Sequence, residues 1–230
     1  MPGSSSLVDD PPQLFPNPPE GCQGDIERAW YFYLSEISLW RLEVNARRSI
    51  DQLQQGDCRG LPRTLIEVYH DTLSQLEAWR SSLPPLVSIE NGSTTEEDDV
   101  IRFVLRGRVT YVHELISWPF LYAIMSDRNE NGAADQQVAD ALAFHYDRLL
   151  ANTSGYYHRH HGTWLMVRSS ARSACILLGF VRLYPSSRVM PPAWKDAVLL
   201  TLKMVEYWST EIKEMCPVLH TMTRLLEIVE

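Results

Sequence analysis

The sequence predicts an all-α protein: a single helical domain of six or seven helices that follows a disordered, proline-rich N-terminal segment. Apolar side chains recur at steps of three and four residues from residue 25 onward, as on one face of a helix. No segment shows the strict apolar–polar alternation of a strand between turn residues. Prolines and glycines fall mainly between the periodic segments, where they end one helix or open the next.

The domain boundary follows from composition. Residues 1–24 contain six prolines and three glycines and no basic residue. Such a segment buries too little apolar surface to order itself, so we expect a linker over residues 1–24. The folded domain is then expected over residues 25–230.

The first three helices are predicted from caps, prolines and apolar faces. Asp25 is the N-cap of the first helix, Pro62 opens the second, and Pro84-Pro85 stops the second. The capping-box spacing of Thr94 and Glu97 predicts the start of the third helix, and Pro119 is expected to kink it. We expect the following side chains to face the core: on the first helix Trp30, Tyr33, Leu34, Ile37, Trp40 and Val44; on the second Leu65, Tyr69, Thr72, Leu76, Trp79 and Leu83; on the third Val100, Phe103, Val104, Gly107, Tyr111, Leu115, Trp118, Tyr122 and Met125.

Four more helices complete the prediction. A fourth includes Val138, Ala141, Leu142, His145 and Leu149, and a fifth spans roughly Thr163 to Leu183. The fifth is rich in serine and alanine, which let neighbouring helices approach closely, so it is the expected centre of the bundle. Pro192 and Pro217 open the sixth and seventh helices.

Charge and cysteine spacing exclude several classes of protein. The 230 residues include 21 basic and 29 acidic side chains, a net charge of −8, which disfavours direct binding of DNA by this chain alone. The four cysteines form no C-x-x-C pair, so we expect reduced, mostly buried thiols and no metal or other cofactor in this chain. The longest apolar stretch is too short to cross a membrane, and we expect a soluble intracellular protein that does not bind membranes.

The usual enzyme signatures are absent from the sequence. There is no phosphate loop, no G-x-G-x-x-G and no G-x-S-x-G. His113-Glu114 begins an H-E-x-x-H zinc motif, but Ser117 stands where the second histidine is required. We therefore assign no catalytic residue and expect the protein not to be an enzyme.

One polar cluster is a candidate site for a ligand. Three histidines in four residues could bind a divalent metal, but no carboxylate or cysteine lies close in sequence. We favour a structural role, in which these side chains hydrogen-bond to neighbouring helices. Arg168 and Arg172 could bind an anion, or pair with acids such as Glu36 or Glu206, which is the preferred interpretation. The cluster comprises His158, Arg159, His160, His161, Trp164, Arg168 and Arg172.

Four segments, in order, resemble one protein family. The run Glu27-Arg28-Ala29-Trp30-Tyr31-Phe32-Tyr33-Leu34-Ser35-Glu36-Ile37 is similar to an E-R-x-W-Y-x-Y-L-A-E-I segment of fungal zinc-binuclear-cluster transcription factors. Three later segments resemble other helices of the same regulatory, middle-homology-type region. They are Leu76–Pro84, Arg108–Tyr122 and His158–Trp164, and further matches lie at Pro192-Ala193-Trp194 and Tyr207-Trp208. The family-like residues of the first segment are Glu27, Arg28, Trp30, Tyr33 and Glu36.

The resemblance implies an all-helical regulatory domain of a transcription regulator in the nucleus. Its expected partners are proteins of the transcription machinery or a longer homologous regulator, with a small-molecule effector as a further ligand. The six-cysteine cluster that holds zinc and reads DNA in that family has no counterpart among four scattered cysteines. Zinc is therefore expected only if such a cluster precedes this chain, which would make the chain a slice or a truncated relative of a regulator.

Two alternatives remain open from the sequence. The bundle could be a sensor that binds a small metabolite among its aromatic and arginine side chains. More remotely, it could be a helical enzyme with an unrecognised site between His158 and Arg168.

Overall fold

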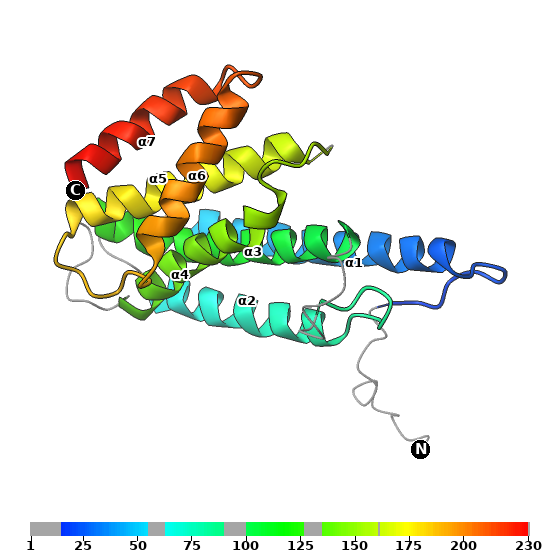
Figure 1. Cartoon of the computed structure of the whole chain (residues 1–230). Coiled ribbons are helices and arrows are strands. Elements are labelled where there is room, and N and C mark those ends of the chain that lie inside the picture. Colours follow the sequence, from blue (N-terminus) through cyan, green and yellow to red (C-terminus); the bar gives the residue numbers. More distant parts are fainter. Residues whose placement is uncertain (1–14, 55–62, 90–99, 127–134, 161, 230) are drawn as a thin grey trace. The chain divides into compact units, whose positions relative to one another are not determined.

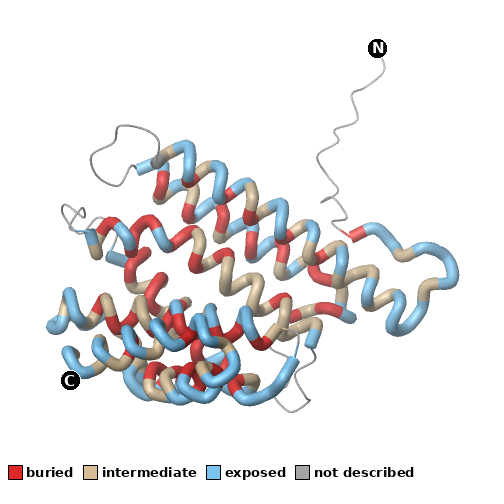
Figure 2. The backbone as a smooth tube through the Cα atoms, turned by 90° about the horizontal axis from the view of Figure 1, so that it is seen from above, coloured by how far each residue is buried: buried red, intermediate tan, exposed pale blue. Residues whose placement is uncertain are grey.

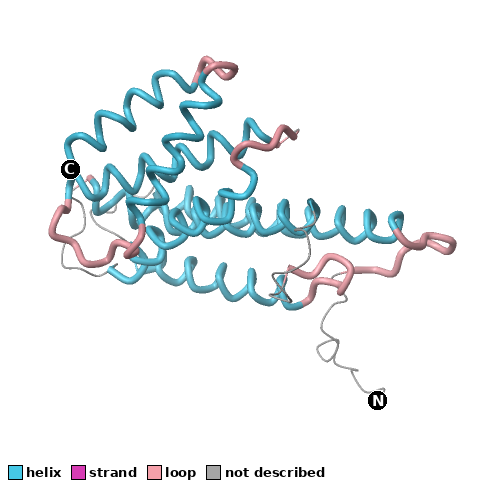
Figure 3. The backbone as a smooth tube through the Cα atoms, viewed as in Figure 1, coloured by secondary structure: helices cyan, strands magenta, loops and turns pink. Residues whose placement is uncertain are grey.

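A computed structural model describes residues 15–54, 63–89, 100–126, 135–160 and 162–229. Within these ranges the chain is helical and contains no strand, which confirms the all-α fold class (Figures 1 and 3). A short 3₁₀ turn, η2, spans Thr153–Gly155. The seven α-helices are α1 (Asp25–Gln54), α2 (Arg63–Ser81), α3 (Val100–Met125), α4 (Asp135–Asn152), α5 (Thr163–Leu183), α6 (Trp194–Ser209) and α7 (Met215–Val229).

The chain forms two compact units. Among the described residues, the first comprises 15–54, 64–89 and 100–112, and the second comprises Arg63 and residues 113–126, 135–160 and 162–229. Helix α3 begins in the first unit and ends in the second, because the boundary falls between Val112 and His113.

The first unit has an apolar core between α1, α2 and the first part of α3. Leu39, Leu76 and Leu105 are among its fully covered side chains. The indole N–H of Trp79 donates a hydrogen bond of 2.8 Å to the Ser38 hydroxyl, so the buried indole keeps a polar partner. The predicted inner face of α2 is confirmed, since Leu65, Tyr69, Thr72, Leu76, Trp79 and Leu83 are all buried.

The predicted inner face of α1 is wrong. Tyr33, Ile37 and Trp40 are 69%, 44% and 54% exposed. The side chains that face the core lie on the other side of the helix; they are Ser35, Leu39, Glu43, Ala46 and Ile50. Apolar residues occupy two opposite faces of α1, and only one of the two is covered (Figure 2).

The N-terminal linker prediction ends too late in the chain. Residues 1–14 lie outside the described residues, but residues 15–24 are described. Phe15 is buried in the core of the first unit, and the Trp30 indole N–H donates to the Pro16 carbonyl over 3.2 Å. A single large aromatic side chain gives this proline-rich segment enough apolar burial to belong to the fold.

In the second unit α5 packs against α4, α6 and α7, which confirms its predicted central position. Its bounds, Thr163–Leu183, are also as predicted. Ser170, Ala171, Ser173 and Ala174 are almost fully buried, and their small size allows the neighbouring helices to approach closely.

The predicted inner face of α3 is wrong in the second unit. Trp118 and Tyr122 are 42% and 47% exposed, whereas Ile116, Phe120 and Leu121 are buried. Almost every turn of this helix carries apolar side chains on several faces, so its spacing alone does not select the covered one. Pro119 lies within the helix, as predicted, and the predicted capping box at Thr94 and Glu97 lies outside the described residues.

Candidate functional site

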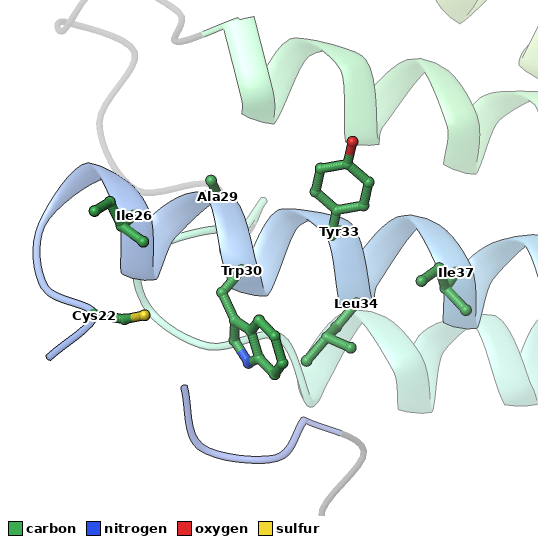
Figure 4. Close-up of a pocket in the computed structure, with 7 residues that line it drawn as sticks. All are labelled: Cys22, Ile26, Ala29, Trp30, Tyr33, Leu34 and Ile37. Carbon is green, nitrogen blue, oxygen red and sulfur yellow. The ribbon is translucent and has the colours of Figure 1, made fainter. Parts of the chain in front are cut away.

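The exposed face of α1 lines an apolar groove. The groove has a volume of about 360 Å³ and lies within the first unit. Figure 4 shows the Trp30 indole turned away from the Tyr33 ring, toward the segment that precedes the helix. Such a lining suits an apolar surface rather than a charged metabolite. The lining residues are Cys22, Ile26, Ala29, Trp30, Tyr33, Leu34 and Ile37.

Charged side chains border the covered side of α1. Arg108 of α3 approaches Glu36 with its Nε 3.6 Å from Oε2, and its Nη2 donates to Glu43 Oε2 over 3.0 Å. Arg47 donates to Glu43 Oε1 over 3.3 Å and to the Tyr111 hydroxyl over 2.8 Å. Burial raises the pKa of Glu36, and the negative charge of Glu43 raises it further. The positive charge of Arg108 acts in the opposite direction. Glu36 and Glu43 therefore form ion pairs with arginines of their own unit.

A buried carboxylate joins three helices of the second unit. Glu114 of α3 is only 4% exposed. Its Oε1 accepts a hydrogen bond from Arg148 Nε of α4, and its Oε2 accepts one from Arg172 Nη2 of α5. A buried charge without partners would be very costly, and two guanidinium groups provide the compensation. With both oxygens occupied by cations, this carboxylate is poorly suited to act as a general base.

His145 of α4 borders the same carboxylate. Its Nδ1 lies 3.0 Å from the Ser173 hydroxyl and 3.6 Å from Glu114 Oε1. Burial lowers the pKa of His145 to about 4; the Glu114 carboxylate opposes this, and the charges of Arg172 and Arg148 add to it. The imidazole is therefore neutral near pH 7, and Ser173 is its nearest hydrogen-bonding partner.

Sequence reasoning missed Glu114, His145 and Arg148 as members of one cluster. Glu114 was considered only as part of an incomplete zinc motif. One signal was present: Glu114 is the only aspartate, glutamate, lysine or arginine between Val109 and Met125 of this helix. Its partners lie 34 and 58 residues further along the chain, so the pairing could not be deduced from local spacing.

The histidine-rich segment begins α5. The Thr163 hydroxyl donates to the His158 carbonyl over 3.1 Å and accepts from the His160 backbone N–H over 2.9 Å. The Gly162 N–H donates to His160 Nδ1 over 3.0 Å. These bonds are local and hold the chain where it enters the helix, whereas the preferred interpretation expected bonds from these side chains to neighbouring helices. His161 lies outside the described residues.

The arginines predicted near that segment have separate partners. Arg159 forms a two-pronged ion pair with Glu211 and lies 5.4 Å from the centre of the Trp208 ring. Arg168 stacks on the half-exposed Trp164 ring at 4.4 Å, which is a cation–π contact. The structure thus distributes the predicted cluster over several places.

The predicted acidic partners of Arg168 and Arg172 are wrong. Arg172 pairs with Glu114 rather than with Glu36 or Glu206, and Glu36 pairs with Arg108. The reason is that α3 and α5 pack so that Glu114 and Arg172 meet, although they are 58 residues apart in the sequence.

The family-like residues of α1 divide between the two faces. Trp30 and Tyr33 line the groove, and Glu36 is directed to Arg108. Glu27 and Arg28 are half-buried in the first turns of the helix. The segment that carries the resemblance therefore supplies both residues of the groove and part of the charged border on the covered side of α1.

Three cysteines are described, and all are free thiols. Cys22 and Cys175 are half-buried and Cys216 is exposed, and Cys58 lies outside the described residues. Burial raises the pKa of Cys175 to about 11, which makes it a poor nucleophile near neutral pH. Among the described residues no group of three or more histidine, cysteine, aspartate or glutamate side chains is arranged to hold a metal ion.

By length and composition, α5 could cross a membrane. Half of its most apolar window is buried within the protein, and core helices of soluble proteins pass the same test. Its packing against α4, α6 and α7 accounts for its apolar character without a membrane.

Comparison with known proteins identifies no relative. No protein-family model matches the chain. No curated protein and no solved structure matches it either. The geometry of the exposed α1 groove and of the buried Glu114 cluster is therefore the basis for any statement about function.

Proposed function

We propose that this chain is a regulatory domain of a nuclear transcription regulator, which acts through contacts with other proteins and does not itself read DNA or catalyse a reaction. The observation that carries the proposal is the exposed apolar face of α1. Tyr33, Ile37 and Trp40 are exposed on a helix of a unit that already has a complete core on the other side. Contiguous exposed apolar surface of this kind marks sites of protein–protein interaction.

Sequence features support the same proposal. Tyr33 and Ile37 of the exposed face lie in the segment Glu27–Ile37, which resembles the regulatory region of fungal zinc-cluster regulators. The net charge of −8 opposes binding to a phosphate backbone, so a separate partner would supply DNA recognition. The proposal includes no cofactor for this chain, since zinc in that family belongs to a six-cysteine cluster.

The arginines give less support to a metabolite sensor. Arg159, Arg172 and Arg108 already pair with carboxylates, and Arg168 lies on an aromatic ring. An anionic effector would have to displace one of these partners. Contacts of the apolar groove with proteins require no such displacement.

The test joins the whole chain to a heterologous DNA-binding domain and measures a reporter with an intermediate basal level in fungal cells. We expect the fusion to raise or lower expression relative to the DNA-binding domain alone. A fusion carrying Tyr33→Glu and Ile37→Glu should lose most of that effect, because charges on the exposed face prevent apolar contact.

The matched control is Lys203→Glu, an exposed position on α6. It should leave the reporter effect unchanged at equal amounts of nuclear protein. Expression equal to that of the DNA-binding domain alone, at matched protein levels, contradicts the proposed function.

A further inference from the structure

The exposed residues of α1 form a seam with the spacing of a helix–helix interface. Steps of four and three residues alternate along the whole seam. This is the spacing at which one helix presents a continuous apolar edge to another helix. Exposed apolar residues scattered singly over a surface would not follow such a regular spacing. Val44 is half-buried, and Trp30 is partly covered by the segment before the helix. The seam residues are Ile26, Trp30, Tyr33, Ile37, Trp40 and Val44.

We infer that this seam binds a second copy of the same chain, with the two α1 helices antiparallel about a two-fold axis. This inference rests on the proposed function, in which the exposed face of α1 binds another protein, and it identifies that protein as a second copy of the chain. An antiparallel register pairs Trp30 with Trp40 of the second copy and Tyr33 with Ile37 of the second copy. Two-fold symmetry repeats both layers, so one seam is complementary to itself.

Charge complementarity selects this occupant. In the same register Glu27 of one copy lies beside Arg41 of the other, twice across the axis. Arg41 is exposed and Glu27 is half-buried, and within the described part of the chain neither side chain makes an ion pair. Both charges are therefore free to pair between copies.

The charges also distinguish antiparallel from parallel pairing. A parallel pair would require Glu36 and Glu43 to reach Arg41 and Arg48 of the other copy. Glu36 and Glu43 already pair with Arg108, and Glu43 is only 9% exposed. The parallel arrangement would have to break those contacts, whereas the antiparallel one uses unpaired residues. In the antiparallel arrangement the Glu36 side chains of the two copies approach each other near the two-fold axis. Arg108 of the same chain compensates the charge of each Glu36.

The first measurement is the mass of the purified full chain by sedimentation velocity. We expect a reversible change from one chain to two over concentrations on the order of micromolar, the range in which interfaces of modest size associate. A chain that stays monomeric throughout overturns the inference. That result would leave the reporter test of the proposed function unaffected, because a different protein could then occupy the face.

The decisive measurement uses charge reversal. At each of the two symmetric contacts, Arg41→Glu places one glutamate beside Glu27 of the other copy, and Glu27→Arg places one arginine beside Arg41 of the other copy. Each single variant should raise the dimer dissociation constant at least about tenfold. An equal mixture of the two variants should regain strong association, because both cross pairs are then of opposite charge.

Three controls make the result specific. Lys203→Glu changes charge by the same amount on α6 and should leave the dissociation constant unchanged. Circular dichroism of each variant, taken where it is monomeric, should match that of the unaltered chain. A mixture that associates no better than either variant alone overturns the antiparallel pairing, even if the unaltered chain forms dimers.

Discussion

Two regions of the molecule, the outer face of α1 and the Glu114 cluster, use polar and apolar side chains in opposite ways. In the first unit α1 leaves Tyr33 and Trp40 exposed to solvent. In the second unit the carboxylate of Glu114 is buried between helices with Arg148 beside it. The comparison shows that whether a side chain is buried depends on the groups of other helices that it meets, rather than on its own polarity alone. A charged group is covered where its counter-charges converge, and an aromatic group stays exposed where no helix covers it.

The strongest way to test that comparison is to remove the buried carboxylate. Glu114→Ala leaves the guanidinium of Arg148 buried without compensation, and we expect it to lower the free energy of unfolding by about 3–5 kcal/mol. Urea denaturation followed by circular dichroism measures the change. The control is Glu211→Ala, which removes an exposed partner of Arg159 and should have no measurable effect. Equal losses in the two variants would contradict the role of burial.

The two faces of α1 supply the next test. Leu39→Ala creates a cavity in the core of the first unit and should cost about 2–5 kcal/mol. Ile37→Ala, two residues away on the exposed face, should change the free energy of unfolding by less than about 0.5 kcal/mol. Both values are measured at concentrations where the chain is monomeric. A large loss for Ile37→Ala in the monomer would show that the face is already covered within one chain.

A smaller effect is expected from the pH dependence of His145. Its pKa is lowered to about 4 in the folded chain, against about 6.5 for an unperturbed histidine. Between these values the unfolded chain binds a proton that the folded chain does not. The contribution of His145 is therefore complete above about pH 6.5 and decreases as the pH falls toward 4, by up to about 3 kcal/mol.

The measurement compares the unaltered chain with His145→Gln between pH 7 and pH 5. The variant should lack this part of the decline. Glu36 contributes in the opposite direction, because its pKa is raised in the folded chain, and it is unchanged in both proteins. Parallel curves for the two proteins would exclude a buried neutral His145.

Local patterns predicted α2 and α5 well. The covered face of α2 is as expected because it has a single apolar stripe, so only one orientation buries it. The bounds of α5 are as expected because Gly162 and Pro185 interrupt the periodic segment on both sides. The prediction for α1 was wrong because this helix has two apolar stripes rather than one. Its outer stripe matches helical spacing as well as its inner stripe does.

The candidate sites differ in how much of them the sequence contained. The aromatic residues of the α1 groove were recognised from their spacing, although they were expected to face the core. The Glu114 cluster was not recognised, because its acid, its histidine and its arginines lie on three helices. Spacing within one helix carries no information on such a convergence.

By itself, the sequence determined that the chain is helical and where several helices begin or end, because caps, prolines and periodicity act over a few residues. Only the tertiary structure decided which face of α1 is covered and which cations accompany Glu114. The physical reason is that burial and charge compensation depend on the residues that a side chain meets, and in a helical bundle these come from distant parts of the chain.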